Sequence, residues 1–144
     1  MEHEKKRVMA KEAIEQVAKS NKFEVLGWRM VPVKPDVLGP LAKENAPGTV
    51  EQLVLKSTAG HTGDKLEQAL YGVQRSTYTA VADKGLDFFD DLIYPCSMSS
   101  RTIVYKGMVR SVVLDQYYQD LSNPEYKSNF AIYHRRFSTN TMPR

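Results

Sequence analysis

Residues 64–85, DKLEQALYGVQRSTYTAVADKG, carry the clearest structural pattern in this chain of 144 residues. Apolar and small side chains recur there at intervals of three and four, which predicts a helix from Asp64 to Lys84 with one buried face. Gly85 predicts the end of this helix, because glycine readily adopts the left-handed conformation found at helix C-termini. The predicted buried face consists of Leu66, Ala69, Leu70, Val73, Thr77, Ala80 and Val81.

One more long helix, two strands and a short helix are expected before this segment. Residues 2–20 predict a helix with apolar side chains near one face and charged ones on the other. Residues 23–31 and 50–56 predict strands, since both are rich in apolar residues and are bounded by turn-forming residues. Residues 37–45 predict a short helix, and residues 57–63 a loop that contains glycine. The apolar face of the first helix would hold Val8, Ile14, Val17 and Ala18.

After Gly85 the chain changes character. Residues 92–94 and 102–105 predict two strands joined by a serine-rich turn at 97–100. The remaining expected elements are a helix over residues 112–121, a turn at Asn123-Pro124 and a strand over residues 130–134. Helices and strands that follow one another in this order predict an α+β layer fold rather than a doubly wound parallel sheet.

Composition limits the class of protein. The chain is 42% hydrophobic and 26% charged, as is typical of an ordinary globular domain. Its net charge of +3 is too small to predict nucleic-acid binding. No apolar run reaches the roughly 18 residues that a membrane span needs, and the charged N-terminus does not resemble a secretory signal. We expect a cytoplasmic location, with an organellar one also open.

Cys96 is the only cysteine, so neither an intrachain disulfide nor a zinc site built from several thiolates is possible. Its thiol could serve as a nucleophile with His134 or His61 as the base. The alternative is a small buried apolar side chain, which is the more common state of a free cysteine.

Two other clusters of polar side chains could either bind a ligand or have no binding role. Asp87, Asp90 and Asp91 could hold a divalent cation, but solvated carboxylates are the simpler interpretation, and we predict no metal site. The hydroxyls of residues 97–100 could bind phosphate, but without a glycine-rich phosphate loop a hairpin turn is favoured.

The richest polar stretch is residues 134–141, HRRFSTNT, at the end of the last expected strand. It combines an imidazole, two guanidinium groups, three hydroxyls and an amide. An arginine can hold a carboxylate through two parallel hydrogen bonds, so this stretch is suited to binding a small zwitterion. The alternative is a solvated polar tail.

Three segments resemble those of glutamate synthases. Residues 97–108, SMSSRTIVYKGM, are similar to the family's SLSSRTIVYKGM, and residues 136–143, RFSTNTMP, to its RFSTNTFP. Residues 23–33, with Val37-Leu38-Gly39 after them, resemble its EVLGWRxVPV…VLG pattern. Order and spacing agree, so the resemblance identifies residues 1–144 as part of a glutamine amidotransferase type 2 domain.

This resemblance implies a fold and a reaction. The expected fold is part of an N-terminal-nucleophile hydrolase sandwich, in which two sheets lie between helix layers (αββα). In this family the thiol of a mature N-terminal cysteine attacks the side-chain amide of L-glutamine, and the free α-amino group serves as base. The ammonia then meets 2-oxoglutarate in other domains of the synthase. Those domains would contain the FMN and the iron–sulfur cluster, and we expect no cofactor in this chain.

The resemblance also assigns residues to the glutamine site. Arg136 matches the arginine that binds the α-carboxylate of glutamine, and Thr139 matches a neighbouring pocket residue. Asn140 occupies a position where related class II amidotransferases have a pocket histidine. Ser99, Ser100 and Arg101 would be structural. No residue of this chain is assigned a catalytic role.

Two departures from the family pattern lead to a further expectation. The chain opens Met1-Glu2-His3 rather than with cysteine, and it stops at Arg144, before the family's Asn-Gly oxyanion element and a downstream Asp. We therefore expect these 144 residues alone to release no ammonia from glutamine. The alternatives are a non-catalytic module that binds glutamine or docks on a synthase, and assembly with complementary chains that complete the site.

Overall fold

The computed structural model describes residues 2–86, 93 and 95–136. The chain forms two compact units. Unit 1 comprises residues 1–30 and 51–106, and unit 2 comprises residues 31–50 and 107–144. Among the described residues, no helix combines the length and apolar character that crossing a membrane requires.

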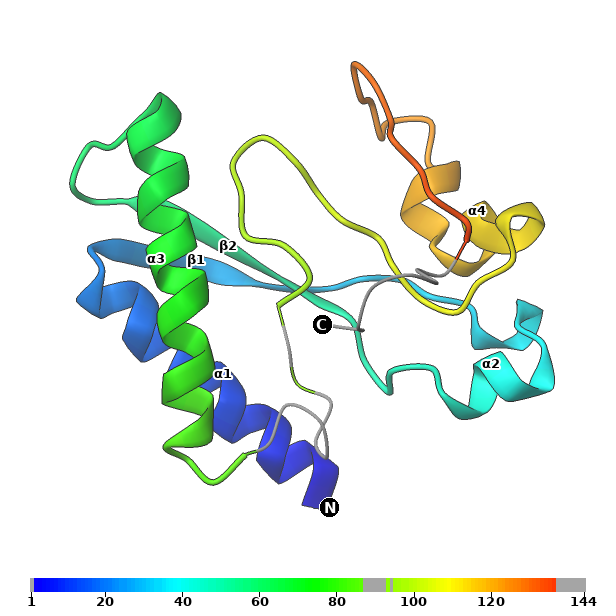
Figure 1. Ribbon diagram of the computed structural model, residues 1–144, viewed down its shortest axis with the longest axis horizontal. Helices are drawn as coiled ribbons and strands as arrows, with labels where there is room; N and C mark the ends of the chain where they lie inside the picture. Colours follow the sequence, from blue (N-terminus) through cyan, green and yellow to red (C-terminus); the bar gives the residue numbers. More distant parts are fainter. Residues whose placement is uncertain (1, 87–92, 94, 137–144) are drawn as a thin grey trace. The chain divides into compact units, whose positions relative to one another are not determined.

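Unit 1 contains the two long helices and the sheet (Figure 1). Its elements are helix α1, Glu2–Ser20, strand β1, Phe23–Met30, strand β2, Glu51–Ser57, and helix α3, Gly63–Ala82. The strands pair antiparallel from Phe23↔Ser57 to Met30↔Glu51, with a bulge between Val25 and Gly27. All four elements were predicted from the sequence, with ends that agree to within two residues.

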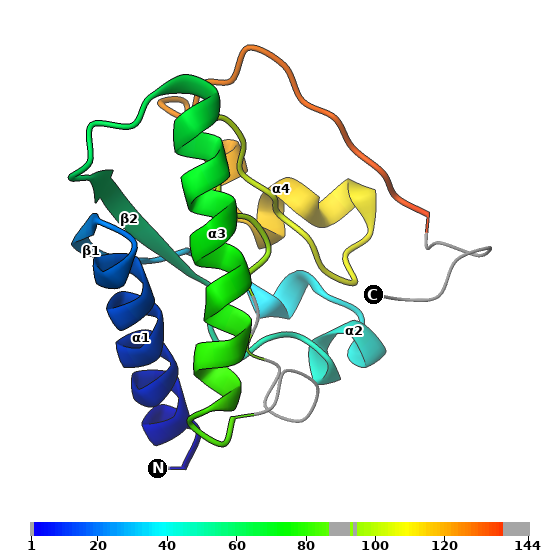
Figure 2. The same ribbon diagram turned by 60° about the vertical axis from the view of Figure 1, so that its left-hand side comes forward.

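Helices α1 and α3 run side by side and pack against the β1–β2 ribbon (Figure 2). Leu70, Val73, Thr77 and Val81 of the predicted face of α3 are buried, which confirms the helical pattern. Two apolar clusters result. The first holds Ala10, Ala13, Val81 and Leu86, and the second holds Ala18, Phe23, Leu70 and Val73.

Gly85 ends α3 as predicted. It has a φ of 72°, a left-handed conformation that costs glycine little and other residues more. Beyond it the N–H of Leu86 bonds to the carbonyl of Val81 at 3.3 Å, and the Leu86 side chain enters the first cluster. The chain is therefore turned back onto the core by the residue that stops the helix.

Polar side chains tie α1 to the ribbon. Glu51 of β2 accepts hydrogen bonds from Arg7 and, at 2.7 Å, from Lys11. The ammonium of Lys11 also lies 4.6 Å from the centre of the Trp28 ring, and the indole N–H donates to Glu15 at 2.8 Å. Burial disfavours the charge of Glu51, but these two cations outweigh it and lower the carboxyl pKa.

Unit 2 is built from short helices around two tyrosines. Tyr117 and Tyr118 are each 2% exposed and meet edge to face, with ring centres 4.7 Å apart. A backbone bridge pairs Val33 with Tyr118, and the N–H of Lys34 donates to the carbonyl of Tyr117 at 2.9 Å. The elements are 3-10 helix η1, Pro35–Val37, helix α2, Pro40–Glu44, 3-10 helix η2, Ser111–Val113, helix α4, Leu114–Tyr117, and 3-10 helix η3, Gln119–Ser122.

The sequence prediction for unit 2 was wrong in two helices. The helix expected over residues 37–45 is divided, because Pro40 disfavours a helical conformation at Gly39, which is extended. The helix expected over residues 112–121 is interrupted at Tyr118, whose extended backbone makes the bridge to Val33. The turn at Asn123-Pro124 is confirmed by a 2.9 Å hydrogen bond from the N–H of Tyr126 to the carbonyl of Asn123.

Two expected strands do not form. Residues 102–105 and 130–134 have no partner strand among the described residues, and Ile132 and Tyr133 are 90% and 82% exposed. A β-branched and aromatic pattern favours an extended backbone, but a strand also needs a neighbour for its hydrogen bonds. Leu92 and Tyr94 of the strand expected over residues 92–94 lie outside the described residues. The mixture of helices with a small antiparallel sheet agrees with the α+β class.

Candidate functional site

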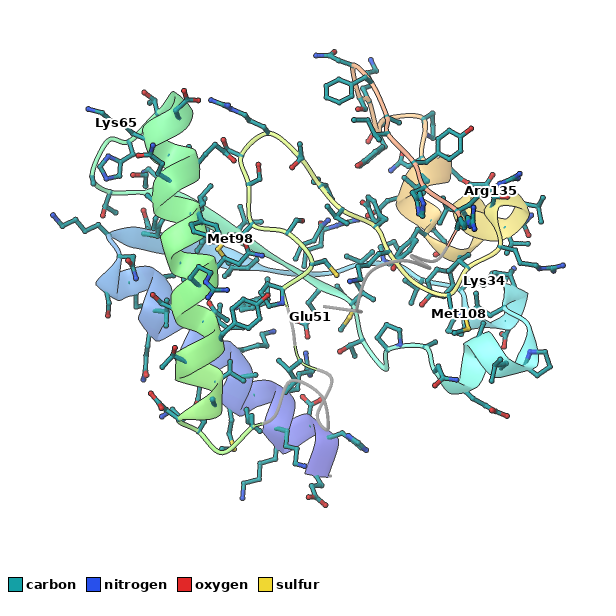
Figure 3. The ribbon with its side chains drawn as sticks, viewed as in Figure 1. Lys34, Glu51, Lys65, Met98, Met108 and Arg135 are labelled. Atoms are coloured by element: carbon teal, nitrogen blue, oxygen red, sulfur yellow. The ribbon has the colours of Figure 1, made fainter. Side chains whose placement is uncertain are left out.

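The segment predicted to bind a carboxylate follows the turn at Asn123 in unit 2. It runs through Phe130, whose carbonyl accepts a 2.6 Å hydrogen bond from the hydroxyl of Ser128. His134, Arg135 and Arg136 are all exposed, and Figure 3 labels Arg135 within this stretch. The guanidinium of Arg136 is therefore accessible to a carboxylate, which it could hold through two parallel hydrogen bonds.

The other two predicted substrate-binding residues, Thr139 and Asn140, lie outside the described residues. The assignment of Arg136, Thr139 and Asn140 to one glutamine site stays a prediction.

The candidate nucleophile Cys96 is exposed. The alternative of a small buried apolar side chain is therefore wrong. His61 lies in the loop between β2 and α3, where its backbone N–H donates to the Ser57 hydroxyl at 3.3 Å. His134 belongs to the exposed segment of unit 2. Among the described residues of unit 1, no hydrogen bond joins the His61 imidazole to this thiol.

Asp87, Asp90 and Asp91, the candidate cation ligands, fall outside the described residues. Among residues 2–86, 93 and 95–136, no three His, Cys, Asp or Glu side chains come together as a metal site would require.

A well-defined polar cluster lies in unit 1, where the segment Ser97–Arg101 meets the first half of α3. Glu67 of α3 accepts three hydrogen bonds from this segment. The hydroxyl of Ser99 donates to one carboxylate oxygen at 2.7 Å. The hydroxyl and the backbone N–H of Ser100 donate to the other, at 2.5 Å and 2.9 Å. One helix turn away, Arg101 forms an ion pair of 2.7 Å with Asp64.

Serine hydroxyls also shape the segment itself. The oxygen of Ser99 accepts hydrogen bonds from the N–H groups of Arg101 and Thr102, at 3.0 Å and 3.3 Å. The oxygen of Ser97 accepts one from the N–H of Val104 at 3.3 Å. The second strand of the hairpin expected here, residues 102–105, does not form among the described residues, and the first, residues 92–94, lies largely outside them. The serines hydrogen-bond to helix α3 and to the backbone of their own segment.

The cluster stabilises the charge of Glu67. Hydrogen bonds from Ser100 and Ser99 lower the pKa of this carboxyl from its usual 4.5 to about 2. The Arg101 charge acts in the same direction, and the hydrogen bond to Asp64 raises the pKa of Arg101. These contacts fit the structural role that the sequence suggested for Ser99, Ser100 and Arg101.

Sequence reasoning did not identify Glu67. The available signal was the spacing of Asp64 and Glu67, which lie three residues apart and so share one side of the predicted helix. Nothing in the sequence linked that side to serines more than thirty residues away.

Comparisons with known proteins agree on one family. The family profile described as "Glutamine amidotransferases class-II" matches residues 1–144. A ferredoxin-dependent glutamate synthase of Synechocystis is 51% identical over 138 residues, which are 96% of this chain. The enzyme of Pyropia yezoensis is 50% identical over 91% of the chain, and the chloroplastic enzyme of Oryza sativa is 47% identical over 94%. The chain spans 8% of the length of each of these three relatives.

Proposed function

Because the chain belongs to the class-II glutamine amidotransferases, we propose that it forms part of the glutaminase domain of a glutamate synthase. The observation that carries this proposal is the match of the family profile over residues 1–144 together with about half-identical glutamate synthase relatives. In the whole enzyme, the domain would hydrolyse L-glutamine to glutamate and ammonia, and the ammonia would aminate 2-oxoglutarate.

We propose that Arg136 binds the α-carboxylate of glutamine, with Thr139 and Asn140 beside it. The exposure of Arg136 supports this role, since a ligand can reach an exposed side chain. A bidentate pair fixes both the position and the orientation of the substrate. The side-chain amide would then lie at a defined distance from a nucleophile outside residues 1–144.

The proposed fold of the complete domain is the αββα sandwich. The layer formed by α1 and α3 against the β1–β2 ribbon would supply one helix layer and part of one sheet. On the opposite face of the ribbon, Leu26 and Val54 are 56% and 48% exposed. Apolar side chains on that face suit packing against a second sheet.

Electron transfer would take place elsewhere in the enzyme. The relatives compared above are named as ferredoxin-dependent, so we propose ferredoxin as the electron donor. FMN and an iron–sulfur cluster are expected outside residues 1–144. Iron–sulfur clusters are held by several cysteine thiolates, and this chain has one cysteine. A chloroplast or the cytoplasm is the proposed location.

The role of Arg136 can be tested in a full-length glutamate synthase that carries these residues as its own segment. Arg136→Ala should raise the KM for glutamine about 100-fold, because a charge-assisted pair contributes about 3 kcal/mol. Arg135→Ala is the matched control, since it removes the same group one residue earlier and should leave KM within about twofold. Initial rates of ammonia release give both values. Equal KM values for the two variants would remove Arg136 from the glutamine site.

A further inference from the structure

The segment Ser97–Arg101, called the strap from here on, makes both apolar and polar contacts with helix α3. Met98 packs against the cluster formed by Ala18, Phe23, Leu70 and Val73, and Figure 3 shows it beside α3. The next residues, Ser99 and Ser100, bond to Glu67. The strap therefore covers one side of the cluster with Met98 and is held by a carboxylate on the same helix.

Most of the polar contacts between the strap and α3 are made by one side chain, Glu67. The strap contains no helix or strand. Three of its polar contacts with α3 end on Glu67, and the fourth is the exposed pair of Arg101 with Asp64. Exposed ion pairs contribute little, typically about 0–1 kcal/mol, whereas hydrogen bonds to an ionised acceptor are stronger and shorter than neutral ones. Glu67 is thus the dominant polar attachment.

The attachment also organises the strap backbone. The Ser99 hydroxyl donates a hydrogen bond to Glu67, and its oxygen accepts hydrogen bonds from the N–H groups of Arg101 and Thr102. If the carboxylate is protonated, one of its two oxygens becomes a hydroxyl donor and the other a neutral acceptor, so the hydrogen bonds that fix the Ser99 and Ser100 hydroxyls weaken. Loss of the contacts with Glu67 would therefore weaken the hydrogen bonds of the Arg101 and Thr102 N–H groups.

We propose that Ser97–Arg101 is a charge-controlled strap, which closes over the apolar cluster while Glu67 is ionised and Ser100 is neutral, and opens when either condition changes. The charged groups that face Glu67 are Asp64 on α3 and Arg101 on the strap. A negative charge at residue 100 would lie at hydrogen-bonding distance from the Glu67 carboxylate, where like charges repel. Opening would withdraw Met98 and uncover the side of Leu70 and Val73.

The test measures hydrogen exchange by mass spectrometry in the full chain at neutral pH, together with trypsin cleavage after Arg101. Glu67→Gln and Ser100→Asp should each speed exchange at residues 101 and 102, and cleavage after Arg101, by about tenfold or more. The double variant should be slower than Ser100→Asp alone, because the amide of Gln can donate a hydrogen bond to the new carboxylate. Glu12→Gln, the same change at an exposed position of α1, should leave both rates unchanged.

Exchange in β1 and β2 shows whether the opening is local. Unchanged rates in the strap for Glu67→Gln would overturn the proposal. A rise of the same size in the strap and in both strands would also overturn it, because the variant would then loosen the whole unit. A double variant that opens as much as Ser100→Asp would rule out control by charge. The milder Ser100→Ala variant removes one donor without adding a charge, and it should give a smaller increase confined to the strap.

Discussion

At the scale of single residues, the polar cluster of unit 1 is held together by the charges of Glu67, Arg101 and Asp64. Glu67 is ionised at neutral pH because the two hydroxyls and the N–H group around it donate hydrogen bonds that stabilise the carboxylate and lower its pKa. Arg101 and Asp64 neutralise each other one helix turn away. The arrangement depends on a single carboxylate that the sequence alone did not distinguish from the other acidic residues of the chain.

The titration of Glu67 gives the first prediction at this scale. Its pKa is lowered from 4.5 to about 2, so its stabilising contacts are complete above pH 4.5 and are lost as the pH falls toward 2. The carboxyl carbon resonance of Glu67 should therefore titrate with a midpoint near 2. In a Ser99→Ala, Ser100→Ala variant, the midpoint should move up toward 4.5. A midpoint near 4.5 in the unmodified chain would contradict the hydrogen-bonded geometry.

The second prediction at this scale concerns Cys96. The family resemblance places the reactive thiol at a mature N-terminus, so Cys96→Ser in a full-length glutamate synthase with this segment should keep its glutaminase kcat/KM within about twofold. Loss of a true nucleophile costs on the order of 10⁴-fold or more. Glutamine-dependent ammonia release measures the difference, and Cys96→Ala provides a second substitution of similar size. A collapse of activity in both variants would make Cys96 the nucleophile.

At the scale of elements, α3 is the helix whose sequence pattern most closely matches its packing. The residues expected to be buried at Leu70, Val73 and Val81 are 7%, 0% and 0% exposed. Short-range periodicity was sufficient because one amphipathic helix needs only one apolar layer to bury its face. The short helices of unit 2 were predicted less well, since Pro40 and the bridge at Tyr118 interrupt them.

This burial gives a prediction for stability. Leu70→Ala should lower the free energy of unfolding by about 2–4 kcal/mol, because it removes buried methyl groups and leaves a cavity. Leu41 is 65% exposed, so Leu41→Ala should change the free energy by no more than about 0.5 kcal/mol. Urea unfolding followed by circular dichroism compares the two variants. Equal losses would mean that the face of α3 does not form the core.

At the scale of the whole molecule, the exposed apolar residues of the last segment are the main feature left to explain. Phe130, Ile132 and Tyr133 are 68%, 90% and 82% exposed, although their pattern is that of a strand. Residues 130–134 belong to no strand among the described residues, and a segment of this kind suits pairing with another strand. In the proposed complete domain, it would enter a sheet and its apolar side chains would be buried.

A substitution at Ile132 tests this interpretation. In the 144-residue chain, Ile132→Asp should leave the free energy of unfolding within about 0.5 kcal/mol, because the side chain is exposed. In a full-length glutamate synthase that carries the segment, the same change should cost about 2 kcal/mol or more, since it would bury a charge.

The matched control is Asn129→Asp, which adds the same charge to a polar side chain in the same exposed stretch. It should leave the free energy of unfolding of both proteins within about 0.5 kcal/mol. If Ile132→Asp is also harmless in both, the segment does not join the sheet, and this part of the proposed sandwich fails.

The sequence by itself determined the elements that depend on neighbours three or four residues away, or on one antiparallel partner. Helices α1 and α3, strands β1 and β2 and the stop at Gly85 were all predicted, because periodicity and glycine conformation are local properties. Motif resemblance also predicted Arg136, Thr139 and Asn140 as residues of a glutamine site. Of these, Arg136 lies among the described residues, where it is exposed.

Only the tertiary structure decided which distant residues meet. Glu67 and the serines of the strap are more than thirty residues apart, and no local pattern joins them. Glu51 with Arg7 and Lys11 is a similar case. The expected strands at 102–105 and 130–134 were wrong because extended backbone is a local preference, whereas a strand exists only where a second chain segment satisfies its hydrogen bonds.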